Sequence, residues 1–213
     1  MNAESSVEHV VSASDWDDFV VVCYFGRDGD WLDRCMRRAY LDMNRTLHGM
    51  DKLGKGHADW KSSALRVLRD RLTMLPGEDT WTQASFDAWH HESVDMLKRS
   101  SSEHGFSSLS VGQGQKWINM SIKYAIALGE RRVPGFFRVY DVAHVALDNI
   151  VLERLTELGM SPLGCAWSRL DDYGQYMGCQ QWIRDHFQGN CLLEVEYRLW
   201  QDAPPNAGES RKQ

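Results

Sequence analysis

A short glycine-containing stretch holds the residues of this chain whose types and spacing could do chemistry. Gly112 and Gly114 form a Gly-x-Gly pattern that leads directly into a helix-like segment. Glycines lack the Cβ atoms that keep an anion from the backbone, and the first N–H groups of a helix have no partner within the helix. We therefore expect a turn here that binds phosphate through its backbone, together with the neighbouring Gln113 and Gln115.

Lys116 follows the second glycine by two residues. We expect it in the first turn of the helix, where the positive end of the helix dipole favours the uncharged amine over the ammonium. An uncharged lysine amine is a nucleophile. The alternative is a solvated lysine on an amphipathic helix, which most lysines are.

A possible partner for Lys116 lies 32 residues further along, at Asp148. The residues after Asp148 have helical apolar spacing, so its simplest role is an N-cap that accepts a backbone N–H. A capping carboxylate can also act in catalysis. We therefore take Lys116 and Asp148 as the candidate catalytic residues.

The two segments together resemble the helix-hairpin-helix DNA glycosylases, above all the lysine-bearing 8-oxoguanine type in its archaeal branch. Gly112 and Gly114 match the hairpin glycines of that family, Lys116 matches its Schiff-base lysine and Asp148 matches its aspartate. Ser110 stands where the family hairpin has a proline. The resemblance covers 109–159, which is about a quarter of the chain.

The resemblance implies a two-lobed, all-α glycosylase fold with a hairpin at 109–128. It implies a DNA glycosylase with apurinic-site lyase activity that removes an oxidised purine such as 8-oxoguanine, with damaged or modified DNA as the partner. Lys116 would attack the sugar C1′ and Asp148 would stabilise the cationic sugar. No cofactor is implied, apart from a monovalent cation that carbonyls of the hairpin can hold.

Two other interpretations stay open. The chain could be a non-catalytic helix-hairpin-helix module that grips DNA, or a helical protein-interaction module in which Gly112 and Gly114 serve only the turn. Binding to DNA would weaken steeply with salt, whereas an interaction module would not bind a duplex. We expect no metal site, because adjacent His90 and His91 point to different sides of a helix.

Apolar residues at three- and four-residue spacing predict helices along most of the chain, and we expect an all-α fold. Two short segments, 19–24 and 192–199, have strand-like composition, but a short apolar run does not distinguish a strand from a buried helix. The expected helices lie around 31–43, 60–75, 85–100, 115–128 and 148–158.

The 213 residues are 43% hydrophobic and 25% charged, which is typical of one globular domain. We expect that domain at 14–202, between flexible tails at 1–13 and 203–213. Five widely spaced cysteines favour reduced thiols. The sequence contains neither an apolar run long enough to cross a membrane nor a signal-peptide pattern, so we expect a cytoplasmic protein.

Charge is distributed unevenly along the sequence. The whole chain carries a formal net charge of −6, but residues 98–138 contain seven basic and two acidic residues, a net charge of +5. The rest of the chain therefore carries −11. This distribution predicts a basic face on an acidic body.

Overall fold

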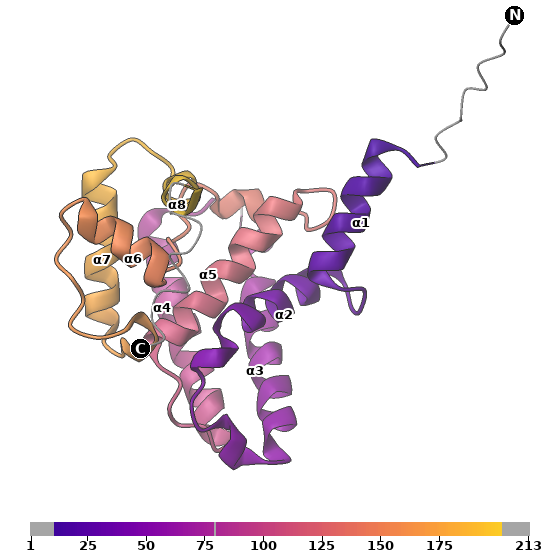
Figure 1. Cartoon of the computed structure of the whole chain (residues 1–213), viewed down its shortest axis with the longest axis horizontal. Coiled ribbons are helices and arrows are strands. Elements are labelled where there is room, and N and C mark those ends of the chain that lie inside the picture. Colours follow the sequence, from indigo (N-terminus) through magenta and orange to yellow (C-terminus); the bar gives the residue numbers. More distant parts are fainter. Residues whose placement is uncertain (1–10, 79, 202–213) are drawn as a thin grey trace, which may run out of the picture.

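The computed structural model describes residues 11–78 and 80–201, and these residues form helices without a strand, which confirms the expected all-α class (Figure 1). Short 3-10 turns connect several of the helices. The α-helices are α1 (Ala13–Phe25), α2 (Trp31–Met43), α3 (Gly56–Leu72), α4 (Gln83–Glu103), α5 (Val111–Leu128), α6 (Asn149–Glu157), α7 (Tyr173–His186) and α8 (Leu192–Gln201), and the 3-10 turns are η1 (Asn44–Thr46), η2 (Met50–Leu53), η3 (Leu75–Gly77), η4 (Phe136–Val139) and η5 (Trp167–Arg169).

Local capping explains where the early helices begin. Asp30 accepts the backbone N–H of Asp33 and so caps α2. At α4, Thr82 is the N-cap and Ser85 completes a capping box three residues later. Helix α4 therefore begins two residues before the expected start near residue 85. Both helices then bury the apolar stripe that their sequences predict.

Helix α5 lies at the centre of the molecule, between α2 and α3 on one side and α6, α7 and α8 on the other (Figure 1). Every residue from Val111 to Ile122 is buried, whichever way its side chain points. A helix that is buried all round is enclosed by its neighbours rather than lying at a surface. The side chains of α5 therefore reach several other elements, which makes it the framework of the candidate site.

The C-terminal part of the chain differs from expectation in two places. Residues 192–199, whose composition resembles a strand, form most of α8. Helix α7 was not expected from the sequence, although Asp172 caps its first turn by accepting N–H groups from Gly174 and Gln175. Both helices pack against the core that the rest of the chain shares.

Helix α1 extends away from the body of the molecule (Figure 1). None of its residues is buried. Contacts at its C-terminal end tie it down: the Tyr24 and Tyr124 hydroxyls lie 3.0 Å apart, and the ring of Phe25 packs edge-on against Tyr124. Asp18 pairs with Arg132. These peripheral contacts leave an apolar face of α1 open.

The expected tails fall largely outside the described residues. Residues 1–10 and 202–213 are not described, whereas Ser12 is already the N-cap of α1. One contiguous set of buried residues, drawn from 32–199, makes up the core. Within the described ranges, no helix is both long and apolar enough to cross a bilayer.

Candidate active site

The Gly-x-Gly stretch is not a turn. Helix α5 begins at Val111, four residues before the expected start, so Gly112 and Gly114 are helical, and 109–128 holds one helix rather than a hairpin. Ser110 and Gln113 form a reciprocal capping box at this start. The Ser-x-x-Gln spacing is a sequence signal for a capping box, but the two glycines favoured a turn instead.

The expected backbone anion site is already occupied by the protein itself. The N–H of Gly112 donates to the Leu170 carbonyl at 2.8 Å, and the N–H of Val111 donates to Asp171 at 3.2 Å. The N–H groups of Gln113 and Gly114 donate to the side chain and carbonyl of Ser110. All four orphan donors of the helix start therefore have partners, and in this conformation none is left for a DNA phosphate.

The two glycines instead allow close packing. A Cβ atom at Gly112 would lie 1.7 Å from the carbonyl oxygen of Trp167 in η5, which no side chain can accommodate. A Cβ atom at Gly114 would lie 3.4 Å from Val94 on α4, an ordinary contact. Gly112 is therefore required by the approach of η5 to α5.

The candidate DNA contacts Gln113 and Gln115 are also internal. Gln113 is 4% exposed and donates to the Thr46 carbonyl at 2.7 Å. Gln115 is fully buried and pairs with both backbone groups of Leu147, accepting its N–H at 3.2 Å and donating to its carbonyl at 2.9 Å. These side chains hold the fold together, and Gln115 fixes the segment that leads to Asp148.

The structure brings Lys116 and Asp148 together. The Nζ atom of Lys116 lies 2.7 Å from Oδ2 of Asp148, and the two side chains are 6% and 17% exposed. The other oxygen of Asp148 accepts the N–H of Val151 at 2.9 Å and so caps α6, as expected. Lys116 is the sixth residue of α5, beyond the first turn, so its setting is defined by Asp148 rather than by the helix terminus.

The electrostatics of this pair keep Asp148 ionised. Burial alone would raise the pKa of the Asp148 carboxyl, but the charge and hydrogen bond of Lys116 outweigh it. The hydrogen bond from Val151 and the more distant charge of Lys123 lower it further, so that the pKa lies below its usual value. Asp148 is thus a carboxylate at neutral pH.

Side-chain amides hold the irregular segment 143–148 that ends at Asp148. Gln115 pairs with both backbone groups of Leu147, and Gln180 pairs in the same way with Val145, at 3.1 Å and 2.9 Å. Between them, the N–H of Ala146 donates to Glu196 at 3.0 Å. Three helices, α5, α7 and α8, therefore position the carboxylate.

A second ion pair lies two turns further along α5. Lys123 pairs with Glu196, whose side chain is only 1% exposed. No local motif marks Glu196, because its partner lies 73 residues away in the sequence. Glu196 joins the Lys123 charge to the backbone of Ala146, so both ion pairs act on the same segment.

A buried polar cluster adjoins this segment at His144. His144 lies 2.7 Å from Asp87 and 2.9 Å from the Tyr176 hydroxyl. Asp87 also binds Arg184 through both oxygens. Burial lowers the pKa of His144, and burial together with the neighbouring His144 holds the pKa of His90 well below its usual value. His90 is therefore neutral inside the core at neutral pH.

Ion pairs neutralise much of the positive charge that predicted a basic face. Among the described residues, the ion pairs of this stretch with carboxylates include those of two lysines that point into the molecule, Lys116 and Lys123. Lys98, Arg131 and Arg132 are also paired with carboxylates. The stretch is therefore basic in sequence but largely neutralised by partners from distant parts of the chain. Sequence counting could not foresee this, because each partner lies 32 to 114 residues away.

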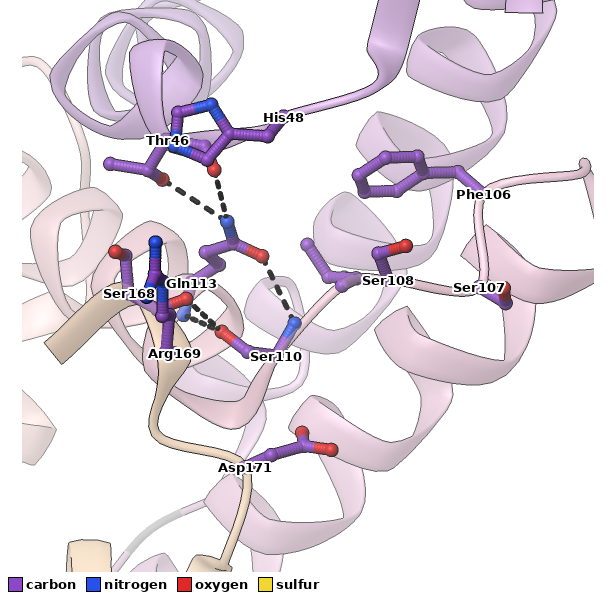
Figure 2. A pocket seen from close by; sticks show the side chains of 11 residues that line it. Thr46, His48, Phe106, Ser107, Ser108, Ser110, Gln113, Ser168, Arg169 and Asp171 are labelled. Carbon is purple, nitrogen blue, oxygen red and sulfur yellow. Dashed lines mark hydrogen bonds between the residues drawn. The ribbon is translucent and has the colours of Figure 1, made fainter. Parts of the chain in front are cut away.

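A pocket opens beside the N-terminal end of α5 (Figure 2). It measures about 270 Å³. Neither Lys116 nor Asp148 lines it, although Gln113, one helical turn before Lys116, does. Its walls come from the loop after η1, the segment before α5, and η5, and they consist of Thr46, His48, Phe106, Ser107, Ser108, Leu109, Ser110, Gln113, Ser168, Arg169 and Asp171.

Comparison of the chain with family models, with curated proteins and with solved structures gave no match. The described residues contain no group of three or more histidine, cysteine or acidic side chains arranged to hold a metal ion.

Proposed function

We propose that this chain is a DNA glycosylase with apurinic-site lyase activity, in which Lys116 is the nucleophile and Asp148 its acid–base partner. The observation that carries the proposal is the 2.7 Å contact between Nζ of Lys116 and Oδ2 of Asp148. An amine and a carboxylate at hydrogen-bond distance, both largely removed from solvent, can exchange a proton. The proposed substrate is DNA with an oxidised purine such as 8-oxoguanine.

The first chemical step is attack on the sugar. Lys116 must lose a proton before it can react, and Asp148 is placed to accept it. The lone pair of Nζ then bonds to C1′ while the bond from C1′ to the base breaks, and the base leaves with the bonding electrons. Asp148 returns the proton to the departing base. The regenerated carboxylate faces the positive charge that develops on the sugar.

The second step cleaves the strand. The amine on C1′ loses a proton as the bond between C1′ and O4′ opens, and O4′ takes up a proton, which leaves an imine between Lys116 and the sugar. Loss of a proton from C2′ then expels the 3′ phosphate by β-elimination. The target nucleotide must leave the base stack to reach Nζ. Because the Lys116 side chain is only 6% exposed, the groups that cover it must also move apart to admit the nucleotide.

The segment 143–148 supports this assignment, because a catalytic carboxylate must be held in place. Gln115 and Gln180 fix Leu147 and Val145 through paired hydrogen bonds, and Val151 anchors one carboxylate oxygen. The other oxygen is thereby aimed at Lys116. Positioning of this kind lowers the cost of reaching a reactive geometry.

Borohydride trapping tests the proposal. Sodium borohydride reduces an imine to a stable cross-link, so the wild-type protein should become covalently attached to duplexes that contain 8-oxoguanine or an abasic site. The Lys116→Gln variant should not. Lys52→Gln is the control, because it removes the charge of a lysine that is exposed to solvent in η2. It should still cross-link.

The outcomes are distinct. Equal cross-linking by the wild type and Lys116→Gln, or none by the wild type on either duplex, would overturn the proposal. Asp148→Asn should bind the duplex like the wild type but release the base at least tenfold more slowly, since the amide cannot accept the lysine proton. Circular dichroism spectra of all variants would show whether each one is folded.

A helical protein-interaction module is the second candidate, and one observation favours it. Trp16, Phe19 and Val20 on α1 are 59%, 55% and 63% exposed, and their spacing places them on one helix face. Exposed apolar groups of this kind often mark contacts with another protein. Absence of both duplex binding and cross-linking would favour this candidate over the enzyme.

A further inference from the structure

The pocket beside α5 has a polar rim whose donors are free. Within the described residues, the side chains of His48, Ser107, Ser108 and Arg169 make no recorded hydrogen bond or ion pair. Figure 2 shows Arg169 on one side of the pocket, Ser107 and Ser108 on the opposite side, and His48 above them. They come from three separate segments of the chain, so the fold, rather than a local motif, brings them together.

The polar groups on the floor of the pocket already have hydrogen-bond partners, in contrast to those on its rim. Gln113 donates to Thr46 and accepts the N–H of Ser110, and the Ser110 hydroxyl donates to the Ser168 carbonyl at 2.8 Å (Figure 2). The hydrogen bonds preform the floor, whereas the exposed donors of the rim are free to turn toward a ligand. The floor groups need no ligand, whereas the rim groups can each donate to one.

The charges around the pocket favour an anion. Arg169 brings a permanent positive charge, and the one carboxylate that lines the pocket, Asp171, is already engaged. Its Oδ1 atom lies 2.5 Å from Nζ of Lys98 and accepts the N–H of Val111 at 3.2 Å. The remaining donors are two hydroxyls and an imidazole. A cation would find only Asp171 as a charged ligand, which is too little for a site.

We propose that this pocket binds a phosphate group, with Arg169, His48, Ser107 and Ser108 as donors. A guanidinium can bind two phosphate oxygens at once, and the serine hydroxyls can serve the others. The pocket, at about 270 Å³, is below the usual range for drug-sized ligands, so it suits a phosphate with little attached to it. The site goes beyond the proposed glycosylase function and does not depend on it.

Calorimetry with undamaged ligands tests this site separately from the lysine chemistry. The probes are inorganic phosphate and a short oligonucleotide with either a 5′ phosphate or a 5′ hydroxyl. Wild-type protein should bind phosphate, and Arg169→Gln should weaken binding at least tenfold. Arg66→Gln is the matched control, because Arg66 is an exposed arginine on α3 outside the pocket, and it should leave the affinity unchanged.

The probes also identify the source of the phosphate. Tighter binding of the 5′-phosphorylated oligonucleotide, with competition by inorganic phosphate, would support a nucleic-acid terminus. Binding of inorganic phosphate with no preference between the two oligonucleotides would support a free phosphate. The double variant Ser107→Ala with Ser108→Ala should also weaken binding, whichever source applies.

Two outcomes would overturn the phosphate site. One is a wild-type protein that binds none of the probes at millimolar concentration. The other is an Arg169→Gln variant that binds phosphate as tightly as the wild type and Arg66→Gln do. Because Arg169 is exposed and the described structure records no partner for its side chain, its replacement should leave the fold intact, which a circular dichroism spectrum can verify.

Discussion

At the scale of single residues, Asp148 has two jobs that one substitution can separate. Its Oδ1 atom caps α6 and its Oδ2 atom pairs with Lys116. Asparagine is also a good N-cap, so Asp148→Asn keeps the first job and loses the second. The variant therefore reports on the ion pair rather than on the helix start.

We expect Asp148→Asn to lower the free energy of unfolding at pH 7 by about 3 kcal/mol, because it leaves Lys116 charged and nearly buried without a partner. The matched change Asp171→Asn, at an ion pair whose acid is 64% exposed, should cost less than about 1 kcal/mol. Urea unfolding of both variants measures this. Equal stability of Asp148→Asn and the wild type would contradict the expectation.

The difference in the free energy of unfolding between the wild type and Asp148→Asn should also depend on pH. Because folding lowers the pKa of Asp148, the carboxylate stabilises the fold above the pKa of unfolded aspartate, about 3.9. That contribution is lost as the pH falls through the lower, folded value. The difference between the wild type and Asp148→Asn should therefore be constant from pH 7 to pH 5 and shrink below about pH 4.

At the scale of elements, the two glycines of α5 should respond oppositely to alanine. Gly112→Ala forces a Cβ atom against the Trp167 carbonyl, and we expect a loss of about 3 kcal/mol or more. Gly114→Ala has room beside Val94 and gains helix propensity, so we expect no loss and a gain of up to about 1 kcal/mol. Thermal or urea unfolding distinguishes them.

The opposite order, or equal losses in both variants, would contradict the role assigned to Gly112. A site that merely needs flexible glycines would lose stability equally at both positions. Phosphate binding provides a second measurement. If η5 must lie against α5 to form the phosphate pocket, Gly112→Ala should weaken phosphate binding, while Gly114→Ala should not.

Sequence reasoning succeeded for elements whose signals are local. Helices α2, α3, α4 and α6 bury apolar residues at helical spacing, and Asp148 caps α6 as its position indicated. It failed where two local signals conflicted. At α5 the glycines suggested a turn, while Ser110 and Gln113 specified a capping box, and the box prevailed because burial stabilises the helix on every side.

The helices that were missed or ambiguous have weaker local signals. Helix α7 contains Gly174 and Gly178, which lower helix propensity, and it is stabilised by burial of Tyr176 and Ile183 instead. Helix α8 was ambiguous because Val195, Tyr197 and Trp200 favour strands, yet it places the buried Glu196 beside Lys123. Such partners are fixed by tertiary packing, which spacing along the chain does not encode.

For the candidate site, the sequence predicted the key pair but not what surrounds it. Lys116 and Asp148 lie together as the proposal from the sequence required. The supporting residues Gln180 and Glu196 come from helices far along the chain, and no motif pointed to them. The phosphate donors His48 and Arg169 are likewise joined only by the fold.

At the scale of the whole molecule, α1 and α5 are opposite extremes of burial. Helix α1 has no buried residue, whereas α5 is enclosed along most of its length. Local opening of α1 breaks only peripheral contacts, so we expect its amides to exchange with solvent at least a hundredfold faster than those of α5. Hydrogen-exchange mass spectrometry of the isolated protein measures this difference.

Equal protection of α1 and α5 would contradict that expectation. Because Trp16, Phe19 and Val20 are exposed, such protection would mean that something covers them. Repeating the exchange at tenfold lower protein concentration would show whether the cover is a second copy of the chain. Faster exchange on dilution would identify self-association.

The glutamine pairs at Gln115 and Gln180 have a consequence for how this protein can vary in length. Each side-chain amide bonds both the N–H and the C=O of one residue, so the backbone is fixed in position at Val145 and at Leu147, two residues apart. An insertion of one residue between Leu147 and Asp148 would move the carboxylate by about 3.3 Å, beyond the reach of the amine.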